Sequence, residues 1–289
     1  MAITASAVKE LRDKTNAGMM ECKKALTETN GDLDAAVKLL REKGIVKAGK
    51  RSDRETSEGI IAASVNADSS AGVLVEVNCE TDFVAKNENF TNFVEEVTGI
   101  IAEGAADSAE AALALTSGEG TVEDTLKAKF IELGEVIAVK RVNRFETAGT
   151  GSVASYIHMG GKVGVLIEVS CEKAETTSAD TFQTLLKDIT LHVAAANPAG
   201  LTRDDIDATV VEEENEINRK QLEAEGKPAN IIDKILVGKI NKFYSEQCLV
   251  EQAFVKDPDT SISKLLEAKG KELGDTLEIK RYARFSVGA

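Results

Sequence analysis

The chain has 289 residues, of which 43% are hydrophobic and 29% charged, a composition that is typical of globular proteins and excludes disordered and fibrous ones. Its formal net charge of −14 argues against wrapping a nucleic-acid backbone, because that binding depends on Lys and Arg displacing counterions. No run reaches the roughly 20 apolar residues of a membrane span, and the N-terminus lacks the apolar run of a secretory signal. We therefore expect a cytoplasmic protein that binds another protein, with no direct contact to nucleic acid or membrane.

The first 50 residues are expected to form a domain of three helices. Apolar residues recur at helical spacing in three stretches, which begin near Ala7, Cys22 and Leu33. Asp32 has the position and chemistry of a helix N-cap, and Gly44 is expected to end the third helix. The polar residues that follow, 51–58, are expected to be a linker.

The rest of the chain contains one segment twice. Residues 59–90 align without a gap on residues 151–182, at an offset of 92 (151 minus 59). A later pair, 132–145 and 272–285, aligns at an offset of 140 (272 minus 132). Each copy reads as two strands joined by a turn, then helix and a closing strand. This pattern predicts an α+β fold with two duplicated sheet-plus-helix subdomains, one over 59–148 and one over 149–200 and 250–289.

The second copy has gained about 48 residues (140 minus 92) between its matched blocks. Residues 201–249 carry two stretches of apolar residues at helical spacing, with Gly226 and Pro228 marking a turn between them. They are expected to form a projecting antiparallel helical hairpin. A hairpin with so little core of its own is expected to pack either on its own domain or on a second subunit, which would make the protein a homodimer.

Motifs of enzymes, metal sites and cofactor sites are not expected in this chain. Gly160, Gly161 and Lys162 resemble part of a phosphate loop, but Val163 stands where such a loop needs Ser or Thr, so a hairpin tip is the better interpretation. The four cysteines are far apart and lack the spacing of a zinc site. His192 lies among apolar residues and is expected to be a packed helix residue.

The two copies differ most after their shared second strand. The first continues with Thr81, Asp82, Phe83 and Val84, where the second has the residues KAET at 173–176. Burial statistics alone give Phe83 about even odds of filling the core. However, the second copy has a glutamate at this position, and Phe90 and Phe182 already supply a matched aromatic. We therefore expect Phe83 to be a wedge that binds another protein.

Two other groups of residues are candidate contact surfaces. At the hairpin tip of the second copy, Tyr156, His158 and Met159 replace small or polar residues of the first copy. They form either a contact surface or a local cluster packed against the tip glycines. In the N-terminal domain, paired methionines adjoin cationic residues and could form a binding surface. The alternative for one of the two methionines is a place in the core. These residues are Arg12, Met19, Met20 and Lys23.

Three motifs of the chain resemble the elongation factor Ts family, the nucleotide-exchange factors of elongation factor Tu. They are LRDKTNAGMMECKKALTETNGDLDAA at 11–36, VLVEVNCETDFVAKN at 73–87 and SYIHMGGKVGVLIEV at 155–169. The resemblance implies a ubiquitin-associated-like N-terminal domain, a core of two subdomains, and a coiled-coil hairpin that dimerises some members. Many members also have a C-terminal helical module, whereas this chain ends at Ala289, so we expect binding to depend more on the other contacts.

The resemblance also implies roles for individual residues. The motif of Thr81, Asp82, Phe83 and Val84 is associated in the family with dislodging Mg²⁺ from the nucleotide site of elongation factor Tu, with the aspartate and phenylalanine pressed between helices of its G domain. The N-terminal residues Arg12, Met19 and Met20, with Lys23 beside them, would contact the same G domain. His158 would contact another domain of the partner.

The expected function is therefore guanine-nucleotide exchange on elongation factor Tu, without a bond-making active site. An alternative of another class is a ubiquitin-associated-type adaptor that binds a partner without exchange activity. A third, more remote alternative is a thiol-dependent enzyme that uses Cys79 as its nucleophile, which would need a neighbouring base and a lowered pKa.

Overall fold

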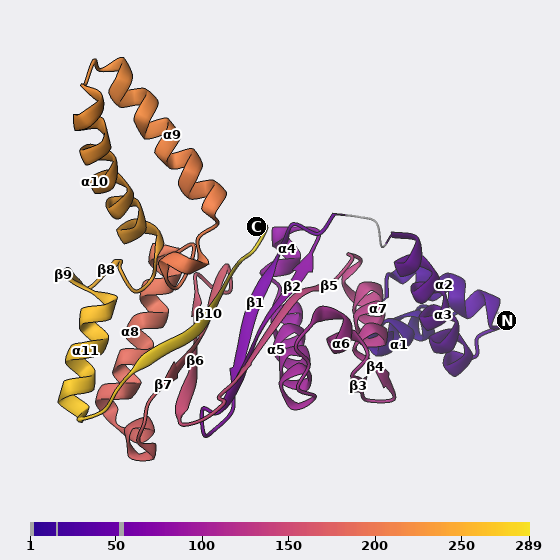
Figure 1. The fold of residues 1–289 in the computed structure, drawn as a ribbon. Coiled ribbons are helices and arrows are strands. Elements are labelled where there is room, and N and C mark those ends of the chain that lie inside the picture. The colour runs from indigo at the N-terminus through magenta and orange to yellow at the C-terminus, as the bar shows by residue number, and fades with distance from the viewer. Residues whose placement is uncertain (1–2, 16, 52–54) are drawn as a thin grey trace.

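The structure, a computed structural model, describes residues 3–15, 17–51 and 55–289, and for residues 44–51 it describes the backbone alone (Figure 1). It is 52% helical and 23% strand. This mixture of separate helices and antiparallel sheets agrees with the predicted α+β class.

Three helices form the N-terminal part: α1 (Ala5–Thr15), α2 (Met19–Glu28) and α3 (Leu33–Arg51). Leu11, Cys22 and Leu26 are fully buried between them. The carboxylate of Asp32 accepts the backbone N–H of Ala35 at 2.9 Å, as expected of the residue before α3. The three helices adjoin the first sheet unit through α7 (Val122–Leu133), whose Ile131 packs against their core.

The third helix does not end at Gly44, as predicted from the sequence, but continues to Arg51. The seven residues after Gly44, IVKAGKR, include an alanine, two lysines and an arginine, which favour helix, and no proline interrupts them. A glycine inside a helix costs only about 1 kcal/mol relative to alanine, so good helix formers on both sides can carry the helix through it.

Two three-stranded antiparallel sheets form the centre of the molecule. The first has the order β1-β2-β5, and the second has the order β10-β7-β6. Their strands are β1 (Glu58–Val65), β2 (Ala71–Cys79), β5 (Ala138–Glu146), β6 (Gly151–His158), β7 (Val163–Ser170) and β10 (Glu278–Ser286). The central strands β2 and β7 are the matched apolar segments, and nearly every residue of both is buried. We call the elements from β1 to β5 the first repeat, and those from β6 to β10 without the helical hairpin the second repeat.

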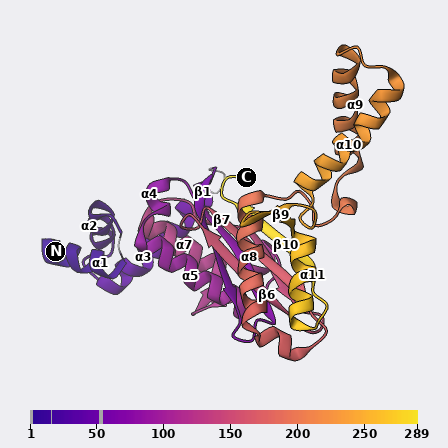
Figure 2. The same ribbon diagram turned by 90° about the vertical axis from the view of Figure 1, so that its left-hand side faces the viewer.

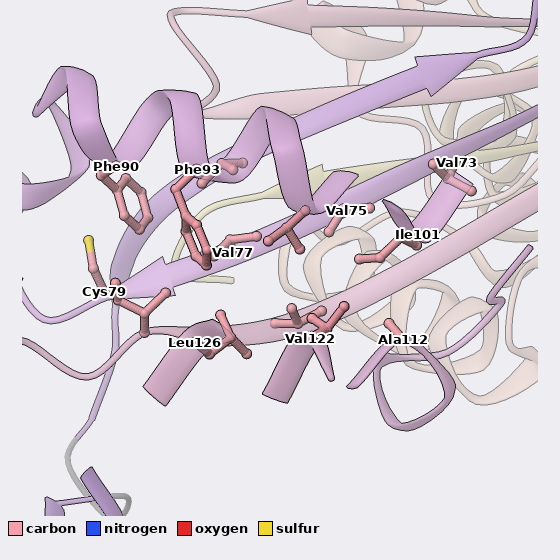
Figure 3. Close-up of a cluster of buried hydrophobic side chains, with 14 of the residues drawn as sticks. Val73, Val75, Val77, Cys79, Phe90, Phe93, Ile101, Ala112, Val122 and Leu126 are labelled. Carbon is pink, nitrogen blue, oxygen red and sulfur yellow. The ribbon is translucent and has the colours of Figure 1, made fainter. Parts of the chain in front are cut away.

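Helices cover the outer face of each sheet (Figures 1 and 2). In the first repeat these are α5 (Glu88–Glu103), α6 (Ala109–Leu113) and α7, and Figure 3 shows Phe90, Phe93 and Ile101 directed onto the valines of β2. In the second repeat, α8 (Asp180–Ala196) and α11 (Ile262–Leu273) have the equivalent positions. The inner faces pack on each other, so the core has four layers: helix, sheet, sheet and helix.

Residues from matched positions form the interface between the two sheets. The first sheet contributes Ile61, Leu74 and Phe145, and the second contributes their counterparts. These counterparts are Val153, Leu166 and Phe285. The two repeats therefore bury the same face against each other, as the halves of a two-fold symmetric dimer do.

Each repeat also contains a short strand pair that the sequence pattern did not predict. In the first repeat it is β3 (Thr116–Ser117) with β4 (Gly120–Thr121), and in the second it is β8 (Ala253–Phe254) with β9 (Asp257–Ser261). Each pair leads into the helix that follows it, α7 or α11. β3, β4 and β8 have two residues each and are too short to show an alternating pattern, and β9, with the sequence DPDTS, has no aliphatic or aromatic residue to show one.

The insert of the second repeat contains a short 3₁₀ turn, η2 (Arg203–Asp205), and two antiparallel helices, α9 (Ala208–Ala224) and α10 (Ala229–Gln247). Both views show the two helices projecting away from the sheets (Figures 1 and 2). Their shared core is small, with Leu222, Ile232 and Leu236 buried. The packing of this hairpin on a second subunit stays a prediction.

Candidate protein-interaction site

Phe83 lies on α4 (Asp82–Ala85), a single helical turn between β2 and α5, and its side chain is 82% exposed. Phe90 and Phe182, the matched aromatics of the two repeats, are fully buried. The interpretation of Phe83 as a core residue is therefore wrong. An exposed phenylalanine on a short connection between a strand and a helix is a candidate for contact with another protein.

The turn that carries Phe83 is fixed at its start by Thr81 and Glu135. One carboxylate oxygen of Glu135 accepts the backbone N–H groups of Glu80 (3.1 Å) and Thr81 (2.9 Å), and the other accepts the Thr81 hydroxyl (2.6 Å). The same hydroxyl oxygen accepts the N–H of Val84 at 3.4 Å and so caps α4. In return, the Glu80 carboxylate accepts the N–H of Val136 at 2.9 Å. We call these contacts the Glu135 clamp.

Asp82 shares the exposed turn with Phe83 and forms an ion pair with Lys86 at 2.7 Å. The hydrogen bond from Lys86 lowers the pKa of the Asp82 carboxyl and raises the pKa of Lys86 itself. Asp82 is therefore a carboxylate throughout the neutral range. The turn presents an aromatic ring beside a negative charge.

The second repeat has the same scaffold without the aromatic ring. Its turn is the 3₁₀ helix η1 (Ala174–Ser178), with Glu175 at the position of Phe83. Asp275, which matches Glu135, accepts the N–H groups of Glu172 (2.9 Å) and Lys173 (3.1 Å) and the hydroxyl of Thr176 (2.5 Å). Although partial burial acts to raise the pKa of Asp275, these hydrogen bonds hold it at about 2. The clamp is thus common to both repeats, and only the first repeat uses it to present a phenylalanine.

The tip between β6 and β7 presents the second group of predicted residues. Met159 is 71% exposed and His158 is exposed beside it, whereas Tyr156 is half-buried against the second core. The Tyr156 hydroxyl lies 3.0 Å from Nδ1 of His158, and the two rings stack with centroids 5.7 Å apart. Tyr156 thus packs against the second core and contacts an exposed imidazole, and the use of the tip as a contact surface stays a prediction.

The same tip is attached to the first repeat at the end that carries Phe83. The N–H of Ile61 donates to the carbonyl of Gly161 at 2.8 Å, and Lys162 forms an ion pair with Glu58 at 2.6 Å. Glu58 pairs across the sheet with Cys79, two residues before Thr81. Gly161 has φ +93°, and a Cβ there would lie 2.6 Å from the side chain of Ile60. A glycine is needed at this approach, which brings the His158 tip to the end of the sheet where the Phe83 turn begins.

The N-terminal candidates all lie on exposed surface. Met19 and Met20 open α2 with 61% and 66% of their surfaces accessible, so neither is a core residue. Arg12 on α1 and Lys23 on α2 are exposed as well. Figure 1 places these helices at the opposite end of the molecule from the helical hairpin.

The buried titratable groups are poorly suited to catalysis. Burial, aided by the nearby charge of Glu135, raises the pKa of Cys79 to about 12, so its thiol is not a ready nucleophile. His192 is fully buried, with Nε2 3.0 Å from the amide oxygen of Gln252 and Nδ1 accepting the N–H of Val255 at 3.3 Å. Burial lowers the pKa of His192, which is a satisfied structural residue as predicted.

The described residues also give no support for a metal site or a membrane-spanning helix. No group of three or more His, Cys, Asp or Glu side chains in them is arranged to hold a metal ion. Within the same part of the chain, no helix has both the length and the apolar character needed to cross a membrane.

The sequence analysis missed the residues that position the candidate site: Glu135, Lys86 and Lys162. One signal for Glu135 was available. The matched blocks ELGE and ELGD place a carboxylate at 135 and 275, directly before the closing strand of each repeat.

Comparison with known proteins identifies the family. The family model described as elongation factor TS matches residues 80–289. The elongation factor Ts of Trichlorobacter lovleyi is 45% identical over 291 residues, covering 100% of this chain and 93% of the relative. That of a Nitratiruptor species is 47% identical over 288 residues (100% and 94%), and that of Clostridium perfringens strain SM101 is 47% identical over 287 residues (99% and 93%). The chain therefore belongs to the elongation factor Ts family.

Proposed function

We propose that this protein is a guanine-nucleotide exchange factor that binds elongation factor Tu in its GDP-bound form and promotes GDP release during translation elongation. The family supports this function, since its members are named elongation factor Ts. The family model matches residues 80–289, which include most of the core and the whole hairpin but not the N-terminal helices, β1 or β2. This does not favour the alternative of an adaptor whose N-terminal helices do all the binding.

The observation that carries the proposal is the exposure of Phe83, 82% accessible beside a carboxylate on a clamped turn. Phe83 and Asp82 enter between helices of the partner's G domain and dislodge its Mg²⁺. The ion is an effective target because it carries the largest local charge opposing the nucleotide phosphates. By linkage, the factor must weaken GDP binding by as much as bound GDP weakens binding of the factor.

Two further surfaces hold the partner while this occurs. Met19 and Met20, flanked by Arg12 and Lys23, contact the same G domain, since flexible methionine side chains adapt to an irregular surface. The exposed imidazole of His158 contacts another domain. No covalent bond is made or broken, so the protein acts by differential binding of two states of its partner.

The direct test is release of a fluorescent GDP analogue from elongation factor Tu, measured by stopped flow with excess unlabelled GDP. We expect the release rate to rise with the concentration of this protein and then to saturate. A release rate that stays at its spontaneous value at every concentration would contradict the proposed function. Adding excess Mg²⁺ should slow the stimulated release, because the ion competes with the Phe83 turn.

A further inference from the structure

The contacts of Glu135 lead to an inference about how the Phe83 turn is held, which rests on the proposed exchange function. We propose that Glu135 is the positioning residue for exchange: by fixing residues 80 and 81, it holds the Phe83 turn in the orientation that the partner requires. Glu135 is 52 residues away from Phe83 in the sequence (135 minus 83) and lies between α7 and β5.

The geometry of the clamp supports this role. Glu135 makes three hydrogen bonds to Glu80 and Thr81, of 2.6 to 3.1 Å, and all three reach residues directly before α4. Hydrogen bonds to a charged group are stronger than those between neutral groups. Since α4 has only four residues, its direction is set mainly by what holds its first residue and by the packing of Val84 and Ala85 on the core.

The exposed ring needs such a support because it has little packing of its own. A side chain that is 82% accessible makes few contacts with its own chain, so the backbone beneath it must define its place. When a mobile loop becomes ordered on binding, the ordering costs free energy and weakens the binding. A preorganised loop avoids this cost. Glu135 thus contributes to the rate without touching the partner's nucleotide site.

The second repeat supplies a matched control inside the same molecule. Asp275 holds residues 172 and 173 in the way that Glu135 holds residues 80 and 81, but the turn after it presents Glu175 in place of an aromatic ring. Removing either carboxylate frees one loop and leaves the other held. Only the first loss should affect exchange.

The experiment compares Glu135→Ala, Glu135→Gln and Asp275→Ala in the fluorescent-GDP assay over a range of factor concentrations. For Glu135→Ala we expect the maximal release rate to fall about tenfold, since it loses several hydrogen bonds and tenfold corresponds to about 1.4 kcal/mol. The concentration at half-maximal rate should change little, because the N-terminal helices and the His158 tip still bind the partner. Asp275→Ala should retain the wild-type rate.

Glu135→Gln keeps the side-chain shape and one oxygen that can accept the two backbone N–H groups. It should therefore fall between wild type and Glu135→Ala, and it decides the question if the alanine variant does not fold. Hydrogen exchange of the backbone amides of Glu80 and Thr81 should rise in the Glu135 variants, and that of Glu172 and Lys173 in Asp275→Ala. This readout shows that each loop has been freed, independently of activity.

Two results would overturn the inference: an unchanged rate in Glu135 variants whose residues 80 and 81 exchange faster, or an equal loss of rate in Asp275→Ala. Phe83→Ala, measured in parallel, separates this failure from that of the proposed function. If Phe83→Ala slows release and the Glu135 variants do not, only the positioning role is wrong. If Phe83→Ala also releases GDP at the full rate, the wedge mechanism itself is wrong.

Discussion

Arg141 of the first repeat lies over Phe285 of the second, with its guanidinium carbon 4.5 Å from the centroid of the ring. The reciprocal pair has the same geometry, with Arg281 at 4.4 Å from the ring of Phe145. Each arginine also forms an ion pair at 2.6 Å with a buried glutamate of its own sheet, Glu76 or Glu168. The interface between the repeats is therefore two-fold symmetric in its electrostatics as well as in its apolar contacts.

Replacing Arg141 by alanine should destabilise the protein strongly. Glu76 is 1% exposed, so the substitution leaves a buried carboxylate without its ion pair, a change that typically costs about 3–5 kcal/mol. The free energy of unfolding from urea titrations measures the effect. Arg144→Ala on the same strand is the control, because Arg144 pairs at 2.6 Å with the exposed Glu146 and such surface pairs contribute about 1 kcal/mol or less. Equal losses in the two variants would contradict this account.

Replacing Phe83 by alanine should affect exchange without affecting stability. The ring is 82% exposed, so its removal leaves the free energy of unfolding nearly unchanged. We expect stimulated GDP release to fall at least about tenfold, equivalent to about 1.4 kcal/mol on the barrier. Glu175→Ala, at the matched position of the second repeat, should release GDP as the wild type does. A folded Phe83→Ala protein with undiminished release would falsify the wedge role.

The strands and helices of the two repeats were largely predictable because local patterns determine them. The apolar runs that became β2 and β7, and the helical spacing of the residues around Phe90 and Phe182, are properties of short windows. The residues next to Phe83 in the sequence were not enough to interpret it. The interpretation came from comparing the two copies in one chain, since a residue that one copy lacks is not needed for the shared core.

The parts that could not be predicted depend on contacts between distant segments or on small energy differences. The Glu135 clamp joins residues 54 to 56 positions apart, and no local pattern reports such a hydrogen bond. The attachment of Gly161 to Ile61 likewise requires the two sheets to be packed first. The end of α3 was misplaced at Gly44 because a glycine is only weakly unfavourable in a helix, and α3 continues through both Gly44 and Gly49.

The cysteines should react slowly with thiol reagents in the native protein. All four are buried, and burial raises the pKa of each. Since the thiolate is the reactive form, we expect labelling by a disulfide reagent at pH 8 to follow the opening of the structure, and to become fast only in denaturant. Cys79→Ser should keep the full exchange rate. Fast labelling of one native thiol, or loss of exchange in Cys79→Ser, would support the thiol-dependent alternative.

His192 should make stability depend on pH below about 6.5. Its ordinary pKa is 6.5, and burial lowers that value in the folded state although the contact with Gln252 opposes the change. Between the folded and unfolded pKa values the unfolded chain binds the additional proton. The free energy of unfolding therefore falls as the pH falls from 6.5, by up to about 1.4 kcal/mol per pH unit, and is independent of His192 above that range.

Urea titrations between pH 7.5 and about 5.5, above the range in which most carboxylates titrate, should show this slope. The slope should disappear in His192→Gln. A slope that survives the loss of His192 would assign it to another group.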